Sequence, residues 1–428
     1  MIYLDNAATT QIEETAFNAM LPFLKGEYGN ASAVYELARN SKRAVFNARK
    51  QCAALIGAAP NELFFTSGGT ESDNWALIGA YEARKKKQAG VQSADGAKAG
   101  EGAFSAEYAS AGADQASAGT EHAKSSERCG HIITTAIEHQ AVLRTAEYLE
   151  SLGVSVTYLK PDSEGFINAS QVLEALREDT FLVSVMTANN EIGTIEPVCE
   201  IADAVHSVRK DILVHTDAVQ AYGQICLQNF AGHVDLLSAS SHKLGGPKGV
   251  GILYIRDGVK IGPLVRGGMQ ESGRRAGTEN VAGIAGFGAA AEHAFAGLDA
   301  KIAAETGLRD RFIAKIGNIT GVIINGPYEK GDNARRLPGN ISVCIKGIEG
   351  ESALIMLDRE GICASSGSAC TSGAREPSHV LKAIGRADDE AKGSLRFTLS
   401  HHNTEEEIDR AAEVLSEIVA KLRERNRF

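Results

Sequence analysis

Seven short apolar runs, spaced along residues 60–260, constrain the fold of this chain more than any other feature of its sequence. Segments long enough for a crossover helix, such as Gln140–Leu152 and Val198–Lys210, separate several of these runs. Strands that alternate with helices are typical of a mainly parallel sheet with helices on both faces. The sequence therefore predicts an α/β domain in the middle of the chain. The expected strands are Leu63–Phe65, His131–Ile133, Val154–Val156, Leu182–Val185, Ile212–Val214, Asp235–Leu237 and Gly251–Ile255.

Three further segments indicate how the rest of the chain is organised. Gly283–Leu298 is rich in Ala and compatible with a helix, and we expect it to lead into a second domain. Thr404–Glu407 matches a helix capping box, and apolar residues then recur at three- and four-residue spacing, which predicts an amphipathic terminal helix. Residues 88–128 are mostly Ala, Gly, Ser and small polar residues. They offer too little apolar surface to offset the entropy lost when a backbone becomes ordered. We expect a mobile insertion there, with a partly helical segment as the alternative.

Charge and cysteine usage exclude several classes of protein. The chain has 44 Lys and Arg against 54 Asp and Glu, a formal net charge of −10, without the basic stripe of a nucleic-acid-binding protein. No run approaches the roughly 20 apolar residues of a membrane span, and the start lacks the layout of a signal peptide. We expect a soluble, cytoplasmic protein. Its seven scattered cysteines include no C-x-x-C pair, which argues against a disulfide framework and a zinc site.

Polar clusters follow the expected strands, and two of them suggest a phosphate site and a reactive amine. Ser67–Ser72 contains two glycines and opens a helical run, so it is either a phosphate cup or a simple strand-to-helix turn. Ser238–Lys243 ends in a lysine among small residues. Burial there would lower the pKa of Lys243 and free its amine to form a Schiff base. The alternative is an exposed lysine, and Lys248 serves as the comparison within the same loop.

Three more clusters follow strands in the same way. Asp217 lies in His215–Gln220, the cluster after Ile212–Val214, where a carboxylate needs a cation such as a pyridinium nitrogen, unless it only caps a turn. His139 could stack on a flat cofactor and move protons, or be structural. Thr187–Gly193 is the third cluster. Because the carboxyl ends of parallel strands bind ligands at one edge of the sheet, we expect all these clusters to converge there.

A last cluster, Ala364–Gly373, lies in the C-terminal part and holds Cys370 among small polar residues. Sequence of this kind predicts a mobile loop, which would expose the thiol. An exposed thiol on such a loop is either a travelling nucleophile or an incidental surface cysteine.

In their order along the chain, these segments resemble the cysteine desulfurases of the class-V aminotransferase family, in the group with a long catalytic-cysteine loop. The resemblance runs almost from end to end. It implies pyridoxal 5'-phosphate as cofactor and the aspartate-aminotransferase-like fold, with a mainly parallel central sheet and a smaller α+β domain. The matching segments are Tyr3–Thr10, Phe65–Asn74, Asn189–Gly193, those of Asp217 and Lys243, Arg275–Thr278 and Ser365–Ser372.

The resemblance also implies domain bounds and residue roles. The large domain would span 15–296, with the insertion at about 88–128, and the small domain 1–14 and 297–428, carrying the cysteine loop. Lys243 is similar to the lysine of the Schiff base, Asp217 to the partner of the pyridine nitrogen and His139 to the stacking acid and base. Arg396 matches the bidentate clamp on the substrate carboxylate. Further implied cofactor contacts are Asn190 and Gln220 at the ring oxygen, Gly69, Thr70, Ser240 and His242 at the phosphate, and Thr278 from the neighbouring subunit.

The implied reaction converts L-cysteine to L-alanine, with Lys243 moving the α-proton and Cys370 taking the sulfur as a persulfide. The implied partners are a second copy of the chain and a sulfur acceptor or iron–sulfur scaffold protein, without nucleic acid or membrane. No resident metal is expected, although Cys370 can transiently contact an iron–sulfur cluster. The alternatives are a selenocysteine lyase, another lyase or aminotransferase with the same cofactor, and a cofactor-free scaffold. Three departures from the family pattern stand at Ser241, where we expect little effect, in Gly29–Tyr35, which lacks the usual proline and histidine and bears on substrate positioning, and in the insertion at about 88–128, which the family does not usually have.

Overall fold

The large sheet forms where the apolar runs lie, because each run is short, apolar and followed by small or polar residues. The computed structural model describes residues 1–96, 129–366 and 377–425. Each of the seven predicted strands coincides with or overlaps a strand of this sheet. In spatial order the strands are β2 (Leu63–Thr66), β8 (Gly251–Ile255), β7 (Leu236–Ser240), β6 (Leu213–Asp217), β5 (Thr180–Ser184), β3 (His131–Thr135) and β4 (Ser155–Leu159).

Strand direction places one edge of this sheet at the centre of the molecule. Strands β3 to β7 pair in parallel, whereas β8 pairs antiparallel with both β7 and β2. Strand β2 therefore points the same way as β7. The carboxyl ends of β2, β3, β5, β6 and β7 meet at a common edge, so the prediction of a mainly parallel sheet is confirmed.

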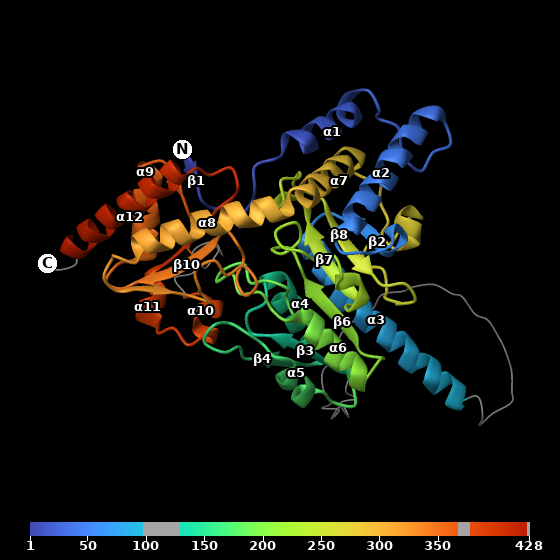
Figure 1. Cartoon of the computed structure of the whole chain (residues 1–428). Coiled ribbons are helices and arrows are strands. Elements are labelled where there is room, and N and C mark those ends of the chain that lie inside the picture. The colour runs from blue at the N-terminus through green and yellow to red at the C-terminus, as the bar shows by residue number, and fades with distance from the viewer. Residues whose placement is uncertain (97–128, 367–376, 426–428) are drawn as a thin grey trace, which may run out of the picture.

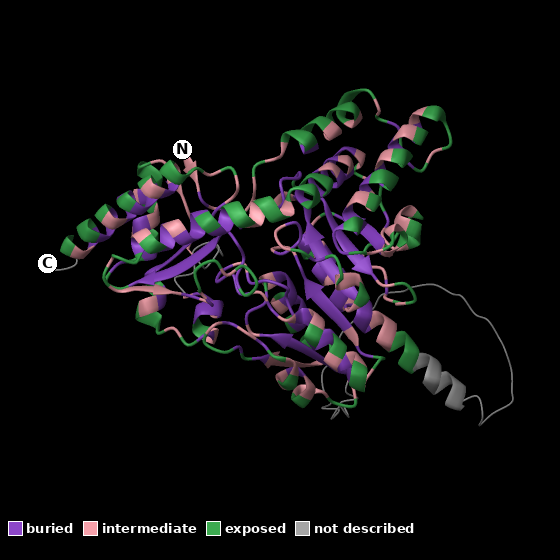
Figure 2. Cartoon of the chain, viewed as in Figure 1, coloured by how far each residue is buried: buried purple, intermediate pink, exposed green. Residues whose placement is uncertain are grey.

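Helices cover both faces of the sheet, and the period-2 alternation of each strand divides the core between them. Ile133 and Leu237 pack on one side, while their neighbours Ile132 and Leu236 pack on the other. Figure 2 shows the strands buried between helices whose outer faces are exposed. The first face is covered by α2 (Glu36–Ala54), α5 (Ala169–Ala175), α6 (Val198–Val208) and α7 (Val281–Ala296), and the second by α3 (Gly69–Gly96) and α4 (Gln140–Ser151). Helix α1 (Glu14–Lys25) packs against α7.

A second core lies in the C-terminal half, which Figure 1 shows at the left, around the orange and red elements. A three-stranded antiparallel sheet, β12-β10-β9, packs there against helices α8, α9 and α12. The N-terminal strand β1 joins this half by pairing in parallel with β11. The bounds are β1 (Ile2–Tyr3), α8 (Leu298–Ile316), β9 (Val322–Ile324), β10 (Asn340–Ile345), α9 (Gly350–Arg359), β11 (Ile362–Cys363), α10 (His379–Ala383), α11 (Asp388–Lys392), β12 (Ser394–Thr398) and α12 (Glu405–Arg425).

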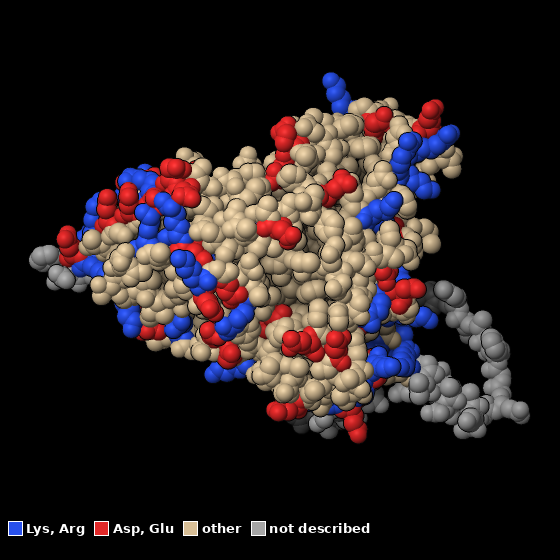
Figure 3. Space-filling model, viewed as in Figure 1, with Lys and Arg blue, Asp and Glu red and all other residues tan. Residues whose placement is uncertain are grey.

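The predicted terminal helix is confirmed together with its capping box. The backbone N–H of Glu407 donates to Oγ1 of Thr404 at 3.2 Å, and the N–H of Thr404 donates to Oε2 of Glu407, also at 3.2 Å. Lys and Arg side chains are interspersed with Asp and Glu over this C-terminal region on the face shown in Figure 3. Some charges of this region pair between α8 and α12, as Arg311 does with Asp409, while the apolar face of α12 packs on α8 and α9.

Helix α3 differs from the expectation for the low-complexity segment. It continues to Gly96, past residue 88 where we expected the insertion to begin. Extending a helix that is already anchored adds one hydrogen bond for each residue fixed, which favours continuation even through small residues. The remainder of the predicted insertion, 97–128, lies outside the described residues. No single helix in the described part of the chain is long and apolar enough to cross a membrane; only α7 and α8 together would qualify, and they are bent by 74°.

Candidate active site

Asp217 ends β6 at the shared strand edge, and its carboxyl group is buried. One oxygen, Oδ1, accepts the backbone N–H of Val219 at 2.9 Å, which is the turn-capping contact that the sequence left open. Asp217 also lies beside His139, with ligand atoms within 4.8 Å of each other. Burial raises the pKa of Asp217, and the nearby His139 and Lys243 act against that rise. The residue therefore caps a turn and still presents a carboxyl group that needs a cation.

A second buried carboxyl group, Asp73, lies behind Asp217 and was not singled out from the sequence. Its Oδ1 is 3.6 Å from Nε2 of His215 and has no hydrogen-bond partner among the described residues. Burial, and next the charge of Asp217, raises the pKa of Asp73 well above its usual range. His215 does not supply the missing cation, because burial lowers its pKa to about 3. Its two ring nitrogens bond the hydroxyls of Ser184 and Ser238 instead.

His139 stands in front of these buried acids with its imidazole exposed. It is the N-cap of α4, and its Nδ1 accepts the backbone N–H of Ala141 at 3.2 Å. That bond places the proton of the neutral ring on Nε2 and fixes the orientation of the ring. An exposed, oriented imidazole beside a buried carboxylate is well placed to stack on a flat cationic ring.

Lys243 follows β7 at the same edge and is directed into the molecule. Its Nζ donates to the backbone oxygens of Ala7 at 2.5 Å and Ala8 at 2.9 Å. Burial, and next the charge of Arg396, lowers the pKa of Lys243 to about 8, although Asp217 acts in the opposite direction. Lys248, in the same loop, is exposed. The amine of Lys243 is therefore much closer to its neutral, nucleophilic form at pH 7 than an ordinary lysine.

The start of α3 forms the cup expected for a phosphate. Helix α3 begins at Gly69, and the N–H groups of a first helical turn have no partner within the helix. A Cβ atom at Gly69 would lie 2.5 Å from Cγ2 of Val219, so only glycine allows the backbone to approach the end of β6 this closely. Glu71 also holds the cup: its Oε2 accepts the N–H of Ser67 at 2.9 Å, and its carboxylate pairs with Arg275.

Of the other predicted phosphate contacts, Ser240 lies beside this cup, whereas Thr278 was expected to reach the cofactor of the neighbouring subunit. Ser240 is buried, and its Cβ would be 3.7 Å from a Cβ at Gly69. His242 bonds Oγ1 of Thr9 through Nδ1 at 3.1 Å, and burial lowers its pKa to about 4. Thr70 is exposed in the first turn of α3. Thr278 lines a cavity of about 220 Å³ together with Ser67. The residues present fit a phosphate at one end and a pyridinium ring at the other, as pyridoxal 5'-phosphate requires.

Arg396 in β12 faces this site from the C-terminal half and is buried. Its Nη1 donates to the backbone oxygen of Asn190 and its Nη2 to Oδ1 of Asp5, both at 3.0 Å. Its Nε is buried without a partner in the described part of the chain. Gln220 donates to the oxygen of Ala7, the same atom that Lys243 bonds. Arg396 is held in place and keeps a donor for a carboxylate, and Asp5 is a second residue that the sequence did not single out.

Cys370 lies outside the described residues, as does the rest of 367–376. Both flanks of that segment adjoin the site. Ser365 exchanges two backbone hydrogen bonds with Arg396, at 2.6 and 3.1 Å. On the other side, Nε2 of His379 bonds the backbone oxygen of Glu138, next to His139, at 3.0 Å. The segment that carries the cysteine thus starts beside the carboxylate clamp and ends beside the stacking histidine.

Two of the departures from the family pattern have different surroundings. Ser241 is buried, and a Cβ atom at Gly246 would lie 2.0 Å from its Oγ. Ser241 therefore fits because residue 246 is glycine, without displacing the backbone that leads to Lys243. Tyr35 precedes α2 with 54% of its surface exposed, and the structure shows no substrate-positioning role for it.

Known proteins share this arrangement. The sequence pattern of the family described as Aminotransferase class-V matches residues 2–101 and 110–411. A protein named cysteine desulfurase IscS, from Methanosarcina thermophila, is 43% identical over 99% of this chain and 93% of its own length. A solved structure named NIFS-like protein superposes with a TM-score of 0.82 at 35% identity, over 98% of this chain and 99% of that one. Another, described as SspA in complex with cysteine, gives 0.74 at 32% identity, over 94% and 100%.

Proposed function

The chain belongs to the class-V aminotransferase family, and on that premise we propose that it is a pyridoxal 5'-phosphate-dependent cysteine desulfurase that converts L-cysteine to L-alanine. The observation that carries the proposal is the position of the Lys243 amine. This amine lies at the same sheet edge as Asp217 and His139, and burial lowers its pKa to about 8. The likeness to relatives named cysteine desulfurase supports cysteine as the substrate.

The residues of the site divide the work of this reaction. When bound, the cofactor supplies an electron sink that stabilises negative charge on the α-carbon of the amino acid. Asp217 holds the positive charge of the ring nitrogen, and His139 packs on the ring. Lys243 anchors the cofactor through its amine and then moves the α-proton. Arg396 binds the substrate carboxylate through its free Nε and one of the donors now shared with Asp5 and Asn190.

Cys370 takes the sulfur in this proposal. Its thiolate attacks the sulfur of bound cysteine, so that a sulfur–sulfur bond forms and the carbon–sulfur bond of the substrate breaks. The electron pair left on the substrate carbon takes up a proton, which gives alanine, and a persulfide remains on the enzyme. The anchoring of the flanks next to Arg396 and His139 supports this role, because both ends of the segment adjoin the substrate site.

The decisive experiment measures alanine and sulfide from purified protein, L-cysteine and a reductant, with the visible spectrum recorded alongside. Lys243→Ala is expected to lose the cofactor absorbance and to lower turnover by roughly 10³-fold or more. Cys370→Ala is expected to keep the absorbance and lose sulfide release. The exposed lysine provides the matched control, Lys248→Ala, which should behave as wild type. Turnover retained in Lys243→Ala would refute the proposal, and alanine release that survives Cys370→Ala would favour a selenocysteine lyase.

The proposal extends to assembly and location: a cytoplasmic homodimer that passes its sulfur to an acceptor or iron–sulfur scaffold protein. Likeness to relatives named IscS supports the acceptor. The segment before Thr278 supports a dimer. Its Met269 is an apolar side chain with 81% of its surface exposed, and Glu271 and Ser272 have positive φ. Strained backbone of this kind persists where the surrounding structure holds it, and a second subunit would supply such contacts. None of the six described cysteines forms a disulfide, as in a reducing compartment. Light scattering of the purified protein tests the dimer directly.

A further inference from the structure

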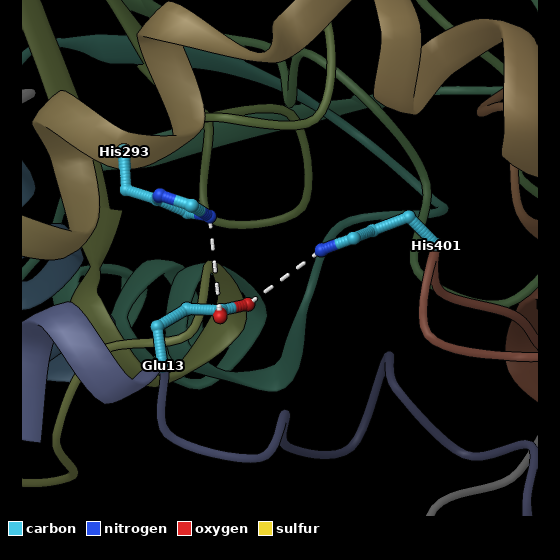
Figure 4. A group of neighbouring side chains, drawn as sticks. All are labelled: Glu13, His293 and His401. Atoms are coloured by element: carbon cyan, nitrogen blue, oxygen red, sulfur yellow. Dashed lines mark ion pairs between the residues drawn. The ribbon is translucent and has the colours of Figure 1, made fainter.

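We propose that Glu13, His293 and His401 form a binding site for a divalent transition-metal ion such as Zn²⁺, outside the cofactor site. Glu13 is the N-cap of α1, His293 lies on α7, and His401 lies in the turn between β12 and α12. Figure 4 shows the two imidazoles pointing toward the carboxylate of Glu13 from two directions. The site is independent of the proposed desulfurase activity, because none of its residues belongs to the catalytic machinery.

The geometry of the three donors is close to that of a metal site. Nε2 of His293 lies 4.0 Å from Oε2 of Glu13, and Nε2 of His401 lies 3.8 Å from Oε1. All three ligand atoms lie within 4.8 Å of one another. Ligands of a tetrahedral zinc ion are separated by about 3.3 Å, as follows from bonds of about 2.0 Å. The two imidazoles reach different oxygens of Glu13, and one ligand atom from each residue lies within 4.8 Å of the others, so movements of up to about 0.8 Å per side chain would complete the coordination.

The donor set favours a metal over other ligands. Two imidazole nitrogens and one carboxylate are the ligands of open zinc sites, in which water or a fourth ligand completes the tetrahedron. His402 is the nearest candidate for that position, since its Nε2 is 2.9 Å from Oε1 of Glu13. A cavity of about 400 Å³ opens beside the cluster and gives the ion and its water a route of entry.

Glu305 occupies the place of an outer carboxylate. Metal-bound histidines usually donate their second ring nitrogen to a carboxylate or carbonyl, which orients the ring. Nδ1 of His401 is buried without a hydrogen-bond partner in the described chain, and Oε1 of Glu305 lies 3.9 Å from it. The same carboxylate oxygen accepts the backbone N–H of His401 at 3.2 Å. A small rotation of the His401 ring would thus let its Nδ1 donate to Glu305 while its Nε2 binds the metal.

The charges around the cluster are compatible with a bound cation. Among the described residues that line the cavity, the only Lys or Arg is Lys301. Its Nζ donates to the backbone oxygen of Gly223 at 3.1 Å, while Glu305 and Glu13 interact with its charge without a hydrogen bond.

A bound ion would connect the two halves of the molecule close to the active site. His401 follows Arg396 by five residues at the end of β12. On the other side, the backbone N–H of Glu13 donates at 2.8 Å to the oxygen of Gly245, two residues after Lys243. The metal would therefore link the strand that carries the carboxylate clamp to the loop that carries the anchoring lysine. In this way the site would hold the two halves in one relative position.

The test is a calorimetric titration of Zn²⁺ into metal-stripped, cofactor-loaded protein. All proteins carry Cys370→Ser, so that this thiol does not compete for the metal. We expect one site per chain, an at least tenfold loss of affinity in His293→Gln and in Glu13→Gln, and a 10- to 100-fold loss in Glu305→Gln. The controls are His233→Gln, a half-buried histidine paired with Asp203, and Cys226→Ser, an exposed thiol. Both should bind as the parent does.

Retained cofactor absorbance verifies that each variant is folded, and His293 is exposed enough for its replacement to be tolerated, with 48% of its side chain accessible. The proposal is overturned if the parent binds no Zn²⁺, if His293→Gln and Glu13→Gln bind it as tightly as the parent, or if the affinity is lost in Cys226→Ser instead. Because every readout is metal affinity, failure here leaves the desulfurase assay unaffected.

Discussion

In the part of the chain that the structure describes, two clusters offer three donor atoms from histidine and carboxylate within 4.8 Å, and they are built for different cations. In the first, Asp73 and Asp217 are buried behind the exposed ring of His139. In the second, a single carboxylate, Glu13, lies between the imidazoles of His293 and His401. Two buried acids behind a ring favour a flat cation that can stack, whereas two imidazoles around one carboxylate favour a compact metal ion. Burial and the balance of donors, rather than residue type, separate the two functions.

The largest effect expected from this comparison is on Asp217. Asp217→Asn keeps a side-chain oxygen for the N–H of Val219 but removes the negative charge that the ring nitrogen requires. Loss of one such preorganised electrostatic contact typically lowers kcat by about 10²–10³-fold, and we expect a loss of that size. Alanine formation per bound cofactor measures it.

The matched control is Asp235→Asn, which removes a buried carboxylate from the opposite edge of the same sheet. Asp235 pairs with His206 and Arg256 and accepts the N–H of Val214, far from the strand ends that hold the site. We expect this variant to be less stable and to keep its turnover per bound cofactor. Equal losses of turnover in both variants would show that Asp217 acts only through stability.

Most of the first site was accessible from sequence because His139, Asp217 and Lys243 lie at or after the ends of strands. The short apolar runs predicted β3, β6 and β7, and topology then brings His139, Asp217 and Lys243 to one edge. Asp73 reaches the same place from the first turns of α3, a helix position that no strand-end rule marks. The one sequence signal for it is a charged residue two positions before the apolar run that begins at Trp75.

The second cluster was not accessible in the same way. Glu13, His293 and His401 come from a loop, a helix and a turn, far apart in the chain, and nothing in their spacing resembles a metal motif. The scattered cysteines exclude only zinc sites built from thiolates, and a site of histidine and carboxylate ligands leaves no trace in cysteine spacing. Only the packing of α1 against α7, with the β12–α12 turn beside them, brings the three side chains together. Long-range packing of this kind is not encoded in a local pattern.

The pH dependence of cofactor capture tests the electrostatics of the first cluster. Because burial lowers the pKa of Lys243 to about 8, its neutral amine increases as pH rises through 8 and is nearly complete by pH 9. The rate at which cofactor-free protein becomes yellow with pyridoxal 5'-phosphate should therefore reach half its maximum near pH 8. Arg396→Gln removes a positive charge that lowers this pKa, so its half-point should move to higher pH. A half-point near 10.5 would contradict the desolvated environment assigned to Lys243.

The smallest expected effect compares two helix N-caps, one beside each cluster. Thr404 caps α12 three residues after His401, and Ser378 caps α10 beside the His139 segment, accepting the N–H of Val380 at 3.1 Å. Thr404→Ala should lower the free energy of unfolding by about 1 kcal/mol, measured in urea, and Ser378→Ala by more, because the Ser378 hydroxyl also donates to the buried carboxylate of Glu191. If the clusters are separate, Thr404→Ala weakens Zn²⁺ binding with turnover unchanged, and Ser378→Ala lowers turnover with Zn²⁺ binding unchanged. Each variant controls for the other, because a general loss of stability would move both readouts together.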